Sequence, residues 1–176
     1  MRKALLFALT LCLASTLSFS QQDKSKRPSP PATASCKLSD GATITIDYSS
    51  PRAKGRTIFG GLVPFGKVWR TGANEATTFV TSADVTVGGS AVPKGSYTLY
   101  TIPEKDHWTV IINKQTGQWG TEYDQSKDLG RVELKAHTLA APQEVMSISF
   151  DDVKKDSAEL HIRWETRDES VKVTTP

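Results

Sequence analysis

Cysteine is nearly absent from this 176-residue sequence, which contains only Cys12 and Cys36. Cys12 lies in an N-terminal segment that we expect to be removed, so the remaining chain cannot form an internal disulfide. We expect Cys36 to be a buried small side chain, with an intermolecular disulfide or a reactive thiol as the alternatives. Stability must therefore come from a hydrophobic core rather than from covalent cross-links.

A strong net charge is also missing. Removal of Arg2 and Lys3 with the N-terminal segment lowers the 22 basic residues to 20, against 19 acidic residues. Such a balance gives no argument for nucleic acid or an anionic membrane as a partner. The sequence also lacks zinc-spaced cysteine and histidine clusters, HExxH and GxSxG. We therefore predict no metal site, no cofactor and no nucleic-acid partner.

Only one long apolar run is present, and it lies at the N-terminus. Two cations, Arg2 and Lys3, precede an apolar stretch that ends at Phe19, and small residues at Ser18 and Ser20 suit cleavage after Ser20. This pattern is typical of a secretory signal peptide, so we predict one over residues 1–20. The mature protein is then expected in the periplasm or outside the cell.

A membrane anchor and a lipoprotein signal are the alternatives for this segment. The apolar run is short and interrupted by serine and threonine, which disfavours a span across roughly 30 Å of hydrocarbon. Leu11 stands before Cys12, where a lipoprotein signal requires a small residue. No later segment is apolar enough to span a membrane.

Residues 21–34 are polar and contain Pro28, Pro30 and Pro31. They show no apolar periodicity, so we interpret them as a Pro/Ser-rich flexible linker. A single domain is expected to follow over residues 35–176.

The period of that domain is two. Apolar and polar residues alternate over 42–48, 132–137, 145–150 and 158–165, as in antiparallel strands with one buried face. Segments 97–102 and 108–112 are apolar on nearly both faces, which predicts central strands joined by a short loop at 104–106. About eight to ten strands are expected, arranged as an all-β antiparallel sandwich.

Turn-forming residues separate the predicted strands. Two glycines in Val87-Gly88-Gly89-Ser90 predict a hairpin turn, and Pro93-Lys94-Gly95 predicts another turn. The only helical signal is a short turn within 121–129.

Residues 48–78 break the strand pattern with a long loop rich in glycine, proline and arginine. Together with Pro93-Lys94-Gly95-Ser96-Tyr97, Thr101-Ile102-Pro103, Trp108-Thr109-Val110 and Trp119-Gly120, the string from Tyr48 to Thr77 resembles the bacterial exported family called domain of unknown function 2911. The resemblance covers roughly residues 35–164. It implies an exported, β-rich protein, and it brings no assigned activity and no catalytic residue.

The loop also contains the main candidate site. Clustered guanidinium groups bind carboxylates or phosphates, and exposed tryptophans stack on sugar rings. We therefore predict a binding or accessory module of the cell envelope with a small polar, anionic or sugar-like ligand. The candidate ligand-binding residues are Arg52, Lys54, Arg56, Trp69, Arg70, Asn74, Glu75 and Trp119.

Two alternatives stay open for this site. Glu75 could be the acid/base of a hydrolase, paired with Asp84, Asp124 or Asp128, although no catalytic motif supports an enzyme. Otherwise Arg70 and Glu75 form a buried ion pair that only pins the loop to the sheet. We expect Arg70 and Glu75 to touch each other, or to share a partner, beside a pocket floored by Trp69. The other aromatic residues, Trp108, Tyr100 and Tyr123, are expected in the core.

Overall fold

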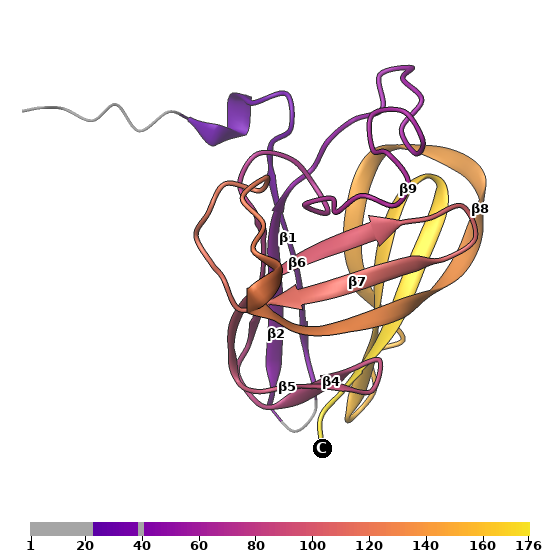
Figure 1. The fold of residues 1–176 in the computed structure, drawn as a ribbon. Coiled ribbons are helices and arrows are strands. Elements are labelled where there is room, and N and C mark those ends of the chain that lie inside the picture. The colour runs from indigo at the N-terminus through magenta and orange to yellow at the C-terminus, as the bar shows by residue number, and fades with distance from the viewer. Residues whose placement is uncertain (1–22, 39–40) are drawn as a thin grey trace, which may run out of the picture.

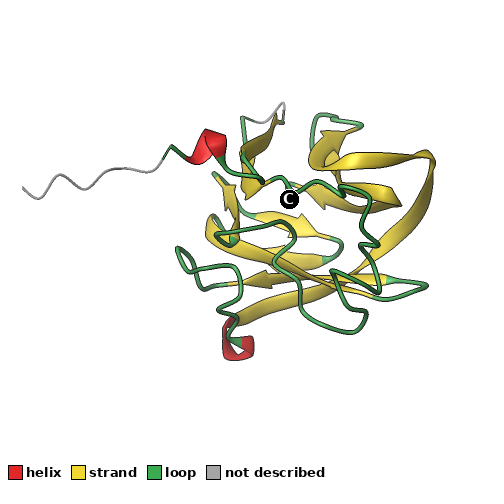
Figure 2. Cartoon of the chain, turned by 90° about the horizontal axis from the view of Figure 1, so that it is seen from above, coloured by secondary structure: helices red, strands yellow, loops and turns green. Residues whose placement is uncertain are grey.

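The computed structural model describes residues 23–38 and 41–176, so the predicted signal peptide lies outside the described residues. The described chain consists mainly of strands and loops (Figure 2). The nine strands are β1 (Pro31–Lys37), β2 (Thr43–Ser49), β3 (Thr77–Thr81), β4 (Val85–Val87), β5 (Ser90–Val92), β6 (Gly95–Pro103), β7 (Trp108–Asn113), β8 (Asp128–Asp151) and β9 (Ser157–Thr174).

Two short 3-10 turns complete the secondary structure, η1 (Lys24–Lys26) and η2 (Gln125–Lys127). Asp23 and Asp124 cap them, because each carboxylate accepts a backbone N–H two residues later. η2 lies within 121–129, where the sequence predicted one turn. Within the described ranges, no helix has the length and hydropathy needed to cross a bilayer.

All strand pairs are antiparallel, and they form one continuous sheet in the order β1-β2-β3-β6-β7-β8-β9-β4-β5. The all-β antiparallel prediction and the strand number are therefore confirmed. The sheet curves, with β8 passing round one side of the molecule and β9 inside that curve (Figure 1). One core cluster includes Ile46 from β2, Val87 from β4 and Ile162 from β9, so strands from distant parts of the sheet face a common interior.

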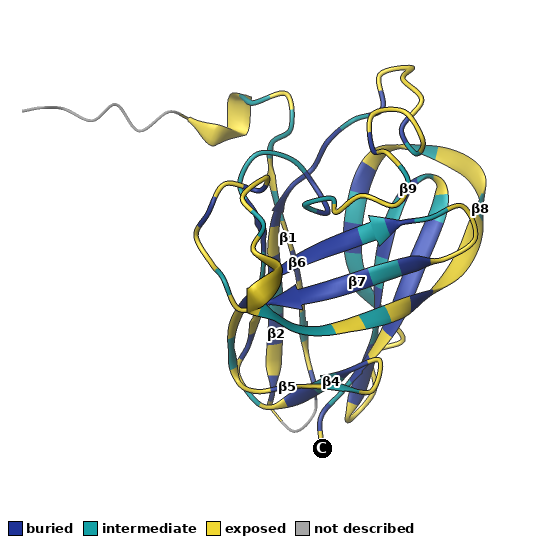
Figure 3. Ribbon diagram, viewed as in Figure 1, coloured by how far each residue is buried: buried dark blue, intermediate teal, exposed yellow. Residues whose placement is uncertain are grey.

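The expected central strands are confirmed. β6 and β7 are buried along most of their length (Figure 3), and Glu104 N donates to His107 O in the loop that joins them. Gly88 and Gly89 have φ angles of 53° and 90°, as the tight turn between β4 and β5 requires. Pro93 and Lys94 form the connection from β5 to β6.

The two segments predicted at 132–137 and 145–150 are parts of one strand, β8. Its pairing with β9 shifts register between Thr138 and Gln143 and again between Gln143 and Ser147. These irregularities bend the ribbon, so the first half of β8 pairs with β7 and the end of β9, while the second half pairs with the start of β9. Alternation alone could not show that the backbone continues through the bend.

The N-terminal boundary also differs from the sequence prediction. β1 starts at Pro31, inside the segment 21–34 that we interpreted as a linker, and pairs with β2 from Pro31↔Ser49 to Lys37↔Thr43. β1 is an edge strand in which only Ala34 is buried. Backbone hydrogen bonds hold such a strand without apolar alternation, and proline is tolerated at its start. Cys36, expected to be buried, is only partly covered there, and burial raises the pKa of its thiol.

Candidate functional site

The loop between β2 and β3 folds into a fixed structure against β6. Trp69 and Thr101 exchange both backbone hydrogen bonds, at 2.7 and 2.9 Å. Beyond Trp69 the backbone turns through positive φ at Thr71 and Asn74. Ala73 N donates to Ser49 O, and the Trp69 indole donates to Gly72 O. These hydrogen bonds pair backbone groups of the strained turn and fix the side chains that project from it.

A pocket of about 320 Å³ opens beside this turn. The turn contributes Trp69, Arg70, Gly72, Ala73 and Asn74 to its lining. Arg56, Leu62 and Val63 come from the earlier part of the loop, and Ser29, Pro51 and Trp164 come from other segments. Four of the eight predicted ligand-binding residues, Arg56, Trp69, Arg70 and Asn74, therefore meet at one pocket.

Arg70 is half-buried in this site without an acidic partner. Its Nε–H is fully covered and donates to no acceptor among the described residues. Gly120 packs so closely that a Cβ there would overlap the Arg70 side chain. Burial lowers the pKa of the guanidinium because the charged form loses solvent. A partly desolvated cation without a counter-charge is the main electrostatic feature of the pocket.

The second guanidinium, Arg56, is exposed and partly committed to the backbone. Its Nε donates to Ala53 O at 3.0 Å and its Nη2 donates to Arg52 O at 2.7 Å. These bonds hold Arg56 in the pocket lining and leave Nη1 without a partner among the described residues.

The segment before β1 contributes Ser29 to the pocket lining. Asn74 Nδ2 donates to Ser29 O at 3.1 Å, and Ser50 N donates to Pro30 O at 2.9 Å. The residues before β1 are therefore attached to the same turn that carries Arg70. Ser29 was not among the predicted site residues, because its polar, proline-rich surroundings are typical of a linker.

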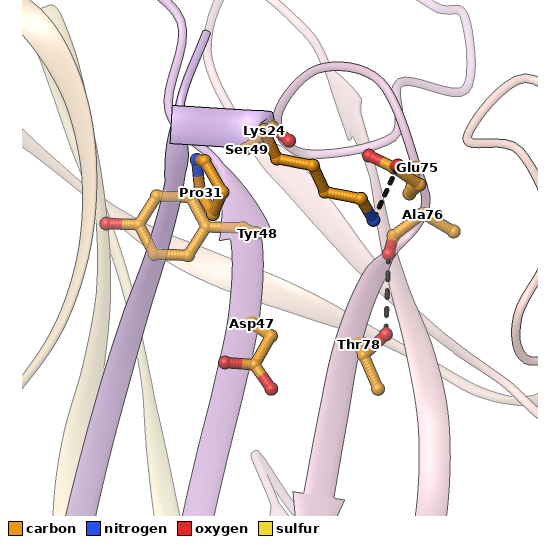
Figure 4. Close-up of a pocket in the computed structure, with 8 residues that line it drawn as sticks. All are labelled: Lys24, Pro31, Asp47, Tyr48, Ser49, Glu75, Ala76 and Thr78. Atoms are coloured by element: carbon orange, nitrogen blue, oxygen red, sulfur yellow. Dashed lines mark hydrogen bonds and ion pairs between the residues drawn. The ribbon is translucent and has the colours of Figure 1, made fainter. Parts of the chain in front are cut away.

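The predicted contact between Arg70 and Glu75 is not formed. Arg27 Nη1 donates to both Glu75 carboxylate oxygens, at 2.9 and 3.0 Å, and Lys24 Nζ lies 2.9 Å from Oε1. Figure 4 shows Lys24 and Glu75 together at a separate pocket of about 160 Å³. Arg27 is 48 positions away in sequence, so a local argument from the loop could not identify it.

These contacts determine the charge of Glu75. Burial alone would raise its pKa, but hydrogen bonds from Lys24, its own backbone and Arg27 outweigh that effect and lower the pKa to about 2. The side chain anchors the N-terminal segment and does not line the pocket of Arg70.

The remaining predicted site residues lie elsewhere. Arg52 donates to Ser50 O, Lys54 is exposed with its N–H bound to Glu144, and neither lines the Arg70 pocket. Trp119 is 46% exposed and its backbone bridges to Glu75. Trp108 and Tyr100 are buried as expected, and Tyr123 is partly covered.

Trp164 joins the pocket from the far end of the sequence. Its ring stacks on Trp69, with centroids 5.9 Å apart and an interplanar angle of 20°. The alternation of residues 158–165 correctly indicated that Trp164 is buried, but it did not indicate that the residue reaches the pocket.

The other titratable candidates have local partners. Asp84 accepts from Lys94 N, Asp124 caps η2, and Asp128 accepts from Tyr123 and Arg131. None of these carboxylates lines the Arg70 pocket. Among the described residues, no three His, Cys, Asp or Glu side chains gather in a way that could hold a metal ion.

His161 of β9 is largely covered. Its Nδ1 lies 2.7 Å from Asp168 Oδ1, in a polar cluster where the β8–β9 ribbon bends. The bend brings Asp168 next to a histidine seven residues earlier, which strand alternation alone could not indicate.

The fold and the site together define an all-β protein with a cationic pocket built around one ordered loop. Residues 29–173 match the family described as "Protein of unknown function (DUF2911)", and the chain belongs to that family. This match confirms the resemblance drawn from the loop motifs and extends it at both ends. No curated protein and no solved structure matched the chain.

Proposed function

We propose that this protein is a binding module of the bacterial cell envelope that holds a small polar or anionic ligand in the Arg70 pocket. The observation that carries this proposal is the half-buried Arg70 guanidinium with no carboxylate partner among the described residues. Burying an uncompensated charge is costly, and an anionic ligand would supply the missing counter-charge.

The surroundings of Arg70 support the same assignment. Arg56 adds a second positive charge, and none of the described residues that line the pocket is acidic. Asn74 is fixed by Ser29 O, so the pocket is largely formed before a ligand enters.

The hydrolase alternative receives no support from the surroundings of Glu75. A carboxylate with a pKa of about 2 is a poor general acid or base near neutral pH. The alternative of a purely structural Arg70–Glu75 ion pair loses its basis, because Glu75 pairs with Lys24 and Arg27.

A thermal-shift screen of the mature chain with small organic and inorganic anions tests the binding function. A ligand that binds the folded state raises the melting temperature, and we expect at least one anion to do so in the wild type but not in Arg70→Met. Lys67→Met is the matched control, because Lys67 is an exposed cation of the same loop outside the pocket. The absence of any anion effect, or an equal effect in Arg70→Met, would contradict the proposal.

Export is tested separately by mass spectrometry of the protein from its native host. The mature chain is expected to begin at or near Gln21, since Ser18 and Ser20 suit cleavage there. Recovery of a chain that retains residues 1–20 in the membrane fraction would count against export by this route.

A further inference from the structure

The donors of the Arg70 pocket suit one particular kind of anion. Arg56 already uses Nε and Nη2 on backbone carbonyls, and Asn74 uses its amide on Ser29 O. Arg70 is the cation of the lining with no such commitment among the described residues. One planar guanidinium presents two parallel donors, which match the two oxygens of a carboxylate. A single guanidinium balances the one charge of a carboxylate, whereas it balances only half the charge of a phosphate dianion.

The lining also has an accessible apolar part. Leu62 is exposed and Trp69 is partly covered, whereas Val63 and the Trp164 ring that stacks on Trp69 are buried. The Trp69 N–H is already bound to Gly72 O, so this indole contributes only apolar surface to a ligand. An apolar wall favours a ligand body that loses little hydration on entry.

The size of the pocket limits that body. Ligand pockets for drug-sized molecules span roughly 300–1,000 Å³. The Arg70 pocket, at about 320 Å³, lies at the lower end of this range and suits a single ring with one acid group.

We propose that the ligand is a small organic carboxylate with an apolar ring, whose carboxylate pairs with Arg70 and whose ring lies against Leu62 and Trp69. This inference rests on the proposed binding function and specifies the ligand class of the same site. It separates the pocket from sites that bind inorganic anions, neutral sugars or sugar acids.

Isothermal titration calorimetry of the mature wild-type chain tests the ligand class. The probes are benzoate, acetate, inorganic phosphate, benzyl alcohol and glucuronate. We expect benzoate to bind at least tenfold more tightly than each of the other four, because only benzoate combines a carboxylate with an apolar ring. Equal binding of acetate or phosphate would overturn the role of the ring, and tighter binding of glucuronate would overturn its apolar character. Binding of benzyl alcohol as tight as benzoate would overturn the role of the carboxylate.

Two pairs of variants assign the contacts. Arg70→Met is expected to weaken benzoate at least tenfold, and Arg70→Lys is expected to weaken it several-fold because an ammonium group lacks the planar fork. Leu62→Asn is expected to weaken benzoate but not acetate, whereas Val68→Asn, an exposed apolar residue outside the pocket, leaves both unchanged. Since Leu62 is exposed, its variant is expected to fold even if Arg70→Met does not.

The outcomes distinguish the two proposals. If no probe binds, or if binding is insensitive to both Arg70 variants, the proposed function itself fails. If an anion other than benzoate binds equally well or better through Arg70, only the ligand class fails. If Leu62→Asn binds benzoate as tightly as the wild type does, the ring does not lie against Leu62.

Discussion

Two arginines of this protein are both partly covered but have opposite electrostatic surroundings. Arg163, on β9, donates to Asp151 Oδ2 at 2.6 Å and lies 3.0 Å from Asp168 Oδ2. Arg70, in the long loop, has no such partner among the described residues. Burial acts to lower the pKa of both, but hydrogen bonds to Asp151 and Asp168 raise the pKa of Arg163, whereas the pKa of Arg70 stays lowered.

The difference separates a structural charge from a binding charge. At the bend of the β8–β9 ribbon, the charge of Arg163 is compensated by Asp151 and Asp168. Ser149 Oγ also accepts a hydrogen bond from Arg163. The Arg70 pocket leaves its charge uncompensated within the protein. Compensated buried charges maintain a fold, while uncompensated ones at a pocket are candidates for ligand contact.

Replacement of Arg163 by methionine is expected to have the largest effect on stability. Arg163→Met would leave Asp168, whose side chain is 11% exposed, with His161 as its one remaining side-chain partner among the described residues. We expect a loss of about 3–5 kcal/mol in the free energy of unfolding, because a stranded buried charge is costly. Urea denaturation followed by circular dichroism measures it. A loss no larger than that of a surface substitution would show that Asp168 is adequately solvated.

A second ion pair on β9, between Arg167 and Glu169, is expected to make the stability of the protein depend on pH. Glu169 is fully covered beside Arg167, and burial outweighs the Arg167 contact and raises its pKa to about 7. The folded state then holds a proton that the unfolded state releases near pH 4.5, so this contribution to stability is present at low pH and is lost as pH rises towards 7.

The Glu169→Gln variant isolates that contribution. Relative to the variant, the wild type is expected to lose roughly 3 kcal/mol of unfolding free energy between pH 4.5 and pH 7. Denaturant titrations of both proteins across this range measure the difference. Parallel pH profiles would mean that Glu169 is ionised throughout.

The Glu75 contacts are expected to have a smaller and more local effect. Arg27→Ala should cost less than about 1 kcal/mol globally, because the Glu75 side chain is 39% exposed and exposed ion pairs contribute little. Amide hydrogen exchange should nevertheless become faster around residues 27–31, since the segment loses its attachment to the loop. Lys26→Ala is the matched control, as its only ion pair among the described residues is a 3.7 Å contact with Asp23. Equal exchange in both variants would argue against an anchoring role for Arg27.

The smallest expected effect on stability is that of Arg70→Met. Removal of an unpaired, partly desolvated cation should change the unfolding free energy by less than about 0.5 kcal/mol, in either direction. The measurement is the same urea denaturation as for Arg163→Met, so the two variants form a direct pair. A loss comparable to that of Arg163→Met would assign Arg70 a structural role and would break the comparison on which the binding proposal depends.

The sequence by itself was sufficient for the features that depend on neighbouring residues. Alternation of Ile44 and Ile46 with polar neighbours predicted β2, and Gly88 and Gly89 predicted the turn between β4 and β5. The composition of the long loop drew attention to Arg56, Trp69, Arg70 and Asn74, which line one pocket. These signals are readable because side-chain direction in a strand and the φ angles of a turn are set within a few residues.

Tertiary structure alone decided which charges are paired. Glu75 has its partner 48 positions away in Arg27, and Trp164 reaches the Arg70 pocket from the last strand of the chain. The bend of β8 and β9 places Asp168 beside Arg163 and away from the loop. Whether a cation has a carboxylate partner depends on every segment that packs around it. Strand alternation does not indicate which distant segments those are. For this reason the same residue type became a structural contact at position 163 and a candidate ligand contact at position 70.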